Sequence, residues 1–164
     1  MKIKIAGLIE EDFVNYKVPS MTIMMPHCSG KCNRDAGEIV CQNWELKESK
    51  LFELEIKNLV TRYCYNPITS AIVFQGLEPM DDFDEVLEMI RELRKVAGVN
   101  DDVVIYTGYV EEEVTRQITK LKKYPNIIMK FGRFKPKCLS STCPIDPVLG
   151  IKLATTNQYG KKIS

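Results

Sequence analysis

The chain has 164 residues, of which 45% are hydrophobic and 27% are charged. This length predicts a single domain over residues 1–164 that is large enough to bury its own core. The 23 basic and 22 acidic residues leave a net charge of +1, which excludes a broad electrostatic attraction to nucleic acid or to a membrane surface.

The apolar stretches are the length of strands, so no membrane-spanning helix of roughly 20 residues is predicted. Residues 1–5 alternate charged and apolar side chains and lack the long apolar core of a signal peptide. We therefore expect a cytoplasmic protein. In that compartment its six cysteines are expected to be metal ligands or free thiols rather than disulfides.

Hydrophobic periodicity predicts strands that alternate with helices along the chain. In chain order these are a strand at 2–8, a strand at 21–25, a helix at 46–63, a strand at 71–74, a helix beginning at 81, a strand at 103–106, a helix at 110–121, and strands at 126–129 and 151–154. This alternation favours an α/β fold with a parallel sheet and crossover helices.

Three cysteines, Cys28, Cys32 and Cys41, lie in one loop directly after the strand predicted at 21–25. Thiolates are soft ligands that favour zinc, copper or iron–sulfur clusters. Three of them with no obvious fourth leave one metal position open, and an open position indicates chemistry or ligand binding rather than a structural site.

Two further segments, Gln75 to Pro79 and Thr107 to Tyr109, follow the next two predicted strands. Ligands bind beyond the carboxyl ends of parallel strands, and the cysteine loop ends at the same edge. We therefore expect these three segments to form one shared site.

Four stretches carry a resemblance to a known family: Cys41-Gln42-Asn43, Phe74-Gln75-Gly76-Leu77-Glu78-Pro79, Ile105-Tyr106-Thr107-Gly108-Tyr109, and the tail from Asp146 to Gly150 and on to Gln158. Together they resemble the radical S-adenosylmethionine enzymes, and among these the activating proteins of anaerobic, class III ribonucleotide reductase. The resemblance covers most of the chain from Pro19 onward. The family pattern is Cys-x3-Cys-x2-Cys, whereas this chain has eight residues between Cys32 and Cys41.

The resemblance implies an incomplete (β/α) barrel of about five parallel strands with outer helices. It also implies a 4Fe-4S cluster held by Cys28, Cys32 and Cys41, with S-adenosylmethionine on the open iron. The implied cofactor-binding residues are Asn43, Gln75, Gly76, Leu77, Glu78 and Thr107. No catalytic side chain is implied beyond these cofactors.

The implied activity is that of an anaerobic oxidoreductase. Reductive cleavage of S-adenosylmethionine releases a 5′-deoxyadenosyl radical, which takes a hydrogen atom from a glycine of a large glycyl radical enzyme subunit. The target is anaerobic ribonucleotide reductase, and an electron donor such as flavodoxin or ferredoxin is required.

Other interpretations of the same residues stay open. The three cysteines are also compatible with a zinc site or with free thiols, Glu78 and Asn43 with helix capping, and Thr107 with an ordinary turn. His27 is expected to be a loop residue rather than a ligand. Arg133, Lys135 and Lys137 form a basic strip that is expected to be a solvated face or a partner contact, and no role is assigned to Cys64, Cys138 and Cys143.

Two alternative functions follow from these interpretations. One is a radical S-adenosylmethionine enzyme that acts on another peptide or on a small molecule. The other is a non-catalytic, zinc-stabilised interaction module.

Overall fold

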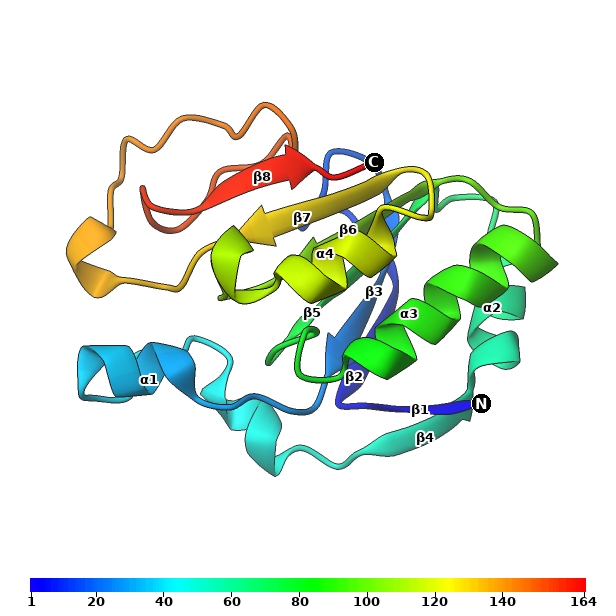
Figure 1. Ribbon diagram of the computed structural model, residues 1–164, viewed down its shortest axis with the longest axis horizontal. Helices are drawn as coiled ribbons and strands as arrows, with labels where there is room; N and C mark the ends of the chain where they lie inside the picture. Colours follow the sequence, from blue (N-terminus) through cyan, green and yellow to red (C-terminus); the bar gives the residue numbers. More distant parts are fainter.

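A computed structural model describes residues 1–164 and contains a six-stranded sheet with the strand order β2-β3-β5-β6-β7-β8 (Figure 1). Its central strands, which run parallel, are β3 (Ser20–Met25), β5 (Ala71–Gly76), β6 (Asp102–Tyr106) and β7 (Ile127–Phe131). Its edge strands, β2 (Gly7–Asp12) and β8 (Tyr159–Lys162), are antiparallel to their neighbours. The short apolar runs of the sequence thus form the buried parallel centre, as expected for strands covered on both faces.

The helices cover one face of this sheet. They are α2 (Ile56–Tyr65), α3 (Phe83–Arg91) with a π-helical extension (Glu92–Val96), and α4 (Thr115–Leu121), which follows a 3-10 turn (Glu111–Glu113). Their apolar sides and alternate residues of the strands form a core cluster of 25 buried residues. None of the helices is long and apolar enough to cross a membrane.

The opposite face of the sheet is covered by irregular segments instead of helices. Tyr16 and Leu149 come from two such segments and pack on Val73, Val104 and Ile128 in a second cluster of six buried residues.

The predicted parallel strands at 21–25, 71–74, 103–106 and 126–129 are confirmed to within two residues at each end. The predicted strand at 151–154 is wrong. Those residues form only an isolated bridge between Lys152 and Ile145, and the last strand is β8, which is antiparallel to β7. The sheet therefore has four parallel strands and two antiparallel edges. Its description as an incomplete barrel stays a prediction.

The predicted helix at 46–63 is wrong in its first half. A 3-10 turn (Trp44–Glu48) is followed by strand β4 (Phe52–Glu55), and α2 begins only at Ile56. Strand β4 pairs antiparallel with β1 (Lys2–Ile5), which places Leu54 opposite the buried Ile3. This pairing also divides the strand predicted at 2–8 into β1 and β2. Pairing with a distant segment thus overrides the local helical pattern, as tertiary context often does.

Asp12, at the end of β2, anchors the segment that covers the second face. Its carboxylate is 4% exposed and accepts hydrogen bonds from the backbone N–H of Val14 (2.8 Å) and Asn15 (3.2 Å) and from the hydroxyl of Thr22 (2.6 Å). Burial alone raises the pKa of Asp12, but these hydrogen bonds and one from the Asn15 side chain outweigh it, so the pKa is lowered.

We expect Asp12→Asn to reduce the free energy of unfolding at pH 7 by about 1–3 kcal/mol, because it leaves buried donors without an acceptor. A lowered folded-state pKa contributes stability above the unfolded pKa and loses it as the pH falls through the folded value. The difference in the free energy of unfolding between the variant and wild type should therefore narrow below about pH 4, where aspartate in the unfolded chain takes up its proton. Urea unfolding at pH 7 and pH 3 measures this, with the exposed Asp84→Asn as control. A difference that does not change with pH would contradict the account.

Candidate metal centre

The cysteine loop begins where β3 ends and contains helix α1 (Lys31–Ala36). Cys28 precedes this helix, Cys32 lies in its first turn, and Cys41 follows it. Figure 1 shows α1 at the end of the sheet to which the arrowheads of β3 and β7 point. All three thiols are partly buried there. This position agrees with the predicted site at the carboxyl ends of the strands.

Two aspartates hold the backbone on either side of Cys28. The N–H of Ser29 donates to Asp81 (2.6 Å), and the N–H of His27 donates to Asp82 (3.3 Å). The imidazole Nδ1 of His27 also contacts the carboxylate of the buried Asp82. The position of Cys28 is therefore determined by the segment that follows Glu78-Pro79, and the ring of His27 faces an aspartate.

An ion-pair network holds the helix that carries Cys32. Arg133 binds Glu113 through two hydrogen bonds (2.9 and 2.7 Å), and Glu113 also accepts one from Lys31 of α1 (2.6 Å). The Nε of Arg133 lies 2.6 Å from the carboxylate of Asp35 as an ion pair without hydrogen-bond geometry. Hydrogen bonding to Arg133 lowers the pKa of Glu113 to about 2.

These contacts correct the expectation for Arg133 alone, because its side chain is only 10% exposed and is paired with acids, whereas Lys135 and Lys137 are exposed as expected. Arg133 is part of the support for the cysteine loop and not of a solvated face.

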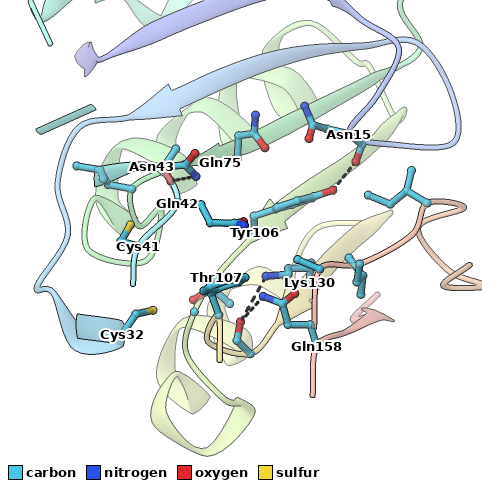
Figure 2. Close-up of a pocket in the computed structure, with 18 of the residues that line it drawn as sticks. Asn15, Cys32, Cys41, Gln42, Asn43, Gln75, Tyr106, Thr107, Lys130 and Gln158 are labelled. Atoms are coloured by element: carbon cyan, nitrogen blue, oxygen red, sulfur yellow. Dashed lines mark hydrogen bonds between the residues drawn. The ribbon is translucent and has the colours of Figure 1, made fainter. Parts of the chain in front are cut away.

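A cavity of about 360 Å³ lies beside the cysteine loop. Cys32 and Cys41 line it, together with five of the residues predicted to bind a cofactor: Asn43, Gln75, Gly76, Leu77 and Thr107. Figure 2 shows the two cysteines at one end of the cavity and Asn15 at the other. Cys28 and Glu78 are not part of its lining. The predicted site residues thus come together, with these two outside the cavity wall.

The segment after β5 is held by backbone contacts to the segment after β3. The N–H of Leu77 donates to the carbonyl of Met25 (3.1 Å), and the N–H of Glu78 donates to that of His27 (2.8 Å). The side-chain amide of Asn43 donates to the carbonyl of Gly76 (3.1 Å) and makes no helix cap. Asn43 therefore contacts the predicted cofactor loop rather than the turn that follows it.

Glu78 joins the ends of β5 and β6. Its carboxylate is 5% exposed and accepts hydrogen bonds from the backbone N–H of Met80 (3.0 Å) and Gly108 (2.9 Å). Burial raises the pKa of Glu78 to about 7. Both carboxylate oxygens are used by the protein, so the geometry favours a role for Glu78 in shaping the loop.

Gly108 lies just after β6 and allows the backbone there to approach the cysteine loop closely. A Cβ atom at this position would lie 3.3 Å from the Sγ of Cys32 and 3.5 Å from a carboxylate oxygen of Glu78. The hydroxyl of the preceding Thr107 accepts the N–H of Tyr109 (3.0 Å), which fixes the turn. The turn thus brings the end of β6 into contact with a candidate ligand.

Several polar residues of the cavity were not predicted as site residues: Asn15, Tyr106, Lys130 and Gln158. The hydroxyl of Tyr106 donates to the carbonyl of Asn15 (Figure 2), and Lys130 and Gln158 both donate to the carbonyl of Gly132. Burial lowers the pKa of the Lys130 ammonium to about 8. Tyr106 and Lys130 are polar residues near the ends of otherwise apolar strands, and that pattern could have identified them.

Comparison with known protein families matches residues 20–141 to the 4Fe-4S single cluster domain. The chain belongs to this family. The matched residues begin at β3 and include the cysteine loop, Gln75 to Glu78, and Thr107. No curated protein and no solved structure matches the chain. The 4Fe-4S single cluster family confirms the predicted iron–sulfur cluster, while the activation of ribonucleotide reductase stays a prediction.

The three cysteines fit a cluster of the 4Fe-4S single cluster family. In the structure no three Cys, His, Asp or Glu side chains converge on one point as the ligands of a single metal ion do. A cluster binds each cysteine through a different iron atom, so it does not require the three thiols to converge on one point. Burial raises the pKa of the Cys28 and Cys32 thiols, and binding to iron would favour their thiolate forms.

Proposed function

We propose that this protein is a radical S-adenosylmethionine activase of a glycyl radical enzyme, with anaerobic ribonucleotide reductase as its target. The observation that carries the proposal is the cavity, because the cysteine loop of a 4Fe-4S family forms one end of it and a mixture of polar and apolar residues forms the rest. Its volume of about 360 Å³ lies within the usual range for small-molecule sites.

With its cluster and S-adenosylmethionine bound, the site would supply an electron to the sulfonium and so generate a 5′-deoxyadenosyl radical. The chain itself would bind and orient the ligand. Backbone groups of Gln75, Gly76 and Leu77, with Asn43 beside them, would hold its amino-acid part next to the cysteines. Gly76 suits this role because it lets the backbone come close to a ligand.

The opposite end of the cavity would receive the nucleoside part of the ligand. Tyr106, Lys130 and Gln158 present an aromatic ring and polar side chains there. Residues 151–154 form a further wall of the cavity and would limit the access of water to the radical. The partner subunit would bring its glycine to this cavity, and flavodoxin or ferredoxin would supply the electron in an anaerobic cytoplasm.

Electron paramagnetic resonance on protein reconstituted anaerobically with iron and sulfide tests the proposal. We expect a reduced 4Fe-4S signal that changes when S-adenosylmethionine is added, because the ligand binds the open iron. A signal that the ligand does not change would contradict the radical assignment. A colourless protein that holds zinc and is indifferent to S-adenosylmethionine would favour the interaction module.

The partner is tested separately. The reduced protein, S-adenosylmethionine and the large subunit of anaerobic ribonucleotide reductase should together give a glycyl radical signal on that subunit. Formation of 5′-deoxyadenosine without that signal would favour a radical enzyme that acts on another peptide or small molecule.

A further inference from the structure

The long spacing between Cys32 and Cys41 is accommodated by a reversal of the chain. Helix α1 ends at Ala36, Gly37 adopts a left-handed conformation (φ 72°), and the chain returns so that Cys41 lines the same cavity as Cys32. Left-handed backbone conformations favour glycine, since it has no Cβ. The six residues beyond the family spacing therefore form part of a helix and of a turn that returns the chain to the cavity.

One side chain of α1 binds the segment of this loop that returns to the cavity. The Oδ1 of Asn33 accepts hydrogen bonds from the backbone N–H of Val40 (2.9 Å) and of Cys41 (3.0 Å). Because both partners are donors, the acceptor oxygen of the amide must face them. Asn33 follows Cys32 directly, so its side chain connects the helix of one candidate ligand to the backbone of another.

The other end of the same amide has no partner in the protein. The Nδ2 of Asn33 is buried and donates no hydrogen bond. A buried donor without a partner is destabilising, and native proteins rarely leave such a group unsatisfied. This donor therefore lacks an acceptor within the protein, on a residue that adjoins Cys32 in the chain and binds the backbone of Cys41.

We propose that Asn33 is the positioning residue of the cluster site. Its Oδ1 sets the place of Cys41, and its Nδ2 donates a hydrogen bond to a sulfur of the bound cluster. The first part concerns the protein without a cluster. The second part rests on the proposed function, because it requires the bound cluster. Hydrogen bonds to the sulfurs are one of the means by which proteins set the properties of such clusters.

Two substitutions separate the two parts. Asn33→Ala removes both the acceptor and the donor. Asn33→Asp keeps an acceptor for the N–H groups of Val40 and Cys41 and removes the donor. Asn66→Ala is the matched control, because the Oδ1 of Asn66 also accepts a backbone N–H, that of Ile68, in a loop at the end of α2.

The first measurement uses protein without a cluster. We expect iodoacetamide to alkylate Cys41 several-fold faster in Asn33→Ala than in wild type, with Asn33→Asp and Asn66→Ala unchanged, as followed by mass spectrometry of the peptide. Equal rates in Asn33→Ala and wild type would overturn the positioning role. This result does not depend on which group the cysteines bind, so it stands apart from the proposed function.

The second measurement uses reconstituted protein. Substitution of a residue that orients a metal ligand typically lowers metal affinity by about 10–100-fold. We therefore expect Asn33→Ala to lose iron to a chelator correspondingly faster than Asn33→Asp. With asparagine labelled at its side-chain nitrogen, pulsed electron paramagnetic resonance should detect a weak nitrogen coupling to the reduced cluster in wild type that is absent in Asn33→Asp. The same coupling in both proteins, or in neither, would overturn the donor role.

Discussion

Replacing Cys41 by alanine is expected to abolish stable cluster binding. Cys41 lines the cavity together with Cys32, and without it only two thiolates remain to hold the iron. Iron and sulfide content after anaerobic reconstitution, followed by desalting, should fall from that of wild type to background. The unfolding midpoint of the protein without a cluster should change little, because Cys41 is only partly buried.

Cys64→Ala is the matched control. Cys64 is an exposed cysteine in the last turn of α2 and lies outside the cavity lining, so its removal should leave the iron content unchanged. Full cluster content in Cys41→Ala would show that the ligand set is a different one and that the eight-residue spacing does not belong to the site.

Gly76→Ala is expected to have the largest effect on stability at the site. Gly76 has φ 103°, and a Cβ atom there would lie 2.7 Å from the backbone nitrogen of Met25 and 2.9 Å from its carbonyl oxygen. The backbone conformation alone costs roughly 1–3 kcal/mol for an alanine. The clash adds to this cost, because the opposing atoms are backbone atoms of the neighbouring strand β3 and cannot rotate away.

The same substitution should weaken cluster retention, since Met25 leads directly into the cysteine loop. Urea unfolding measures the loss of stability, and release of iron to a chelator measures the effect on the site. Gly98→Ala is the control, because Gly98 is also left-handed (φ 69°) but a Cβ there meets no atom within 4 Å. Equal losses of stability in the two variants would show that the strand contact is unimportant.

The centre of the sheet could be predicted from the sequence because each of its parallel strands is a short apolar run between turn residues. The antiparallel strands could not be predicted from the sequence. Strand β8 has the sequence Tyr-Gly-Lys-Lys, whose polarity suits an edge and carries no apolar signal. Strand β4 forms only because residues 2–5 pair with it, and no local window of the sequence contains both segments.

The candidate site divides in the same way. Cys28, Cys32, Cys41 and the Gln75–Glu78 segment could be predicted, because their residue types and their places after strands are local features. The side chains that hold the cysteine loop in place could not be predicted, because each depends on a contact with residues from another part of the chain. Arg133 has the appearance of a surface base in the sequence, yet the fold places it against Glu113 and Asp35. Asn33 similarly acquires its role only when Cys41 returns to it.

The order of strands in the main sheet has a consequence for how the protein is made. The six strands lie side by side in the order in which they occur in the chain, so the sheet can grow by adding one strand at a time during synthesis. The cysteines follow its second strand, whereas Gly76 ends the third strand, and Thr107 and Arg133 follow the fourth and fifth. The thiols therefore leave the ribosome early and are enclosed late. We expect loading with iron and sulfur to follow completion of the sheet, and in the interval the nascent chain presents uncovered thiols to oxidants.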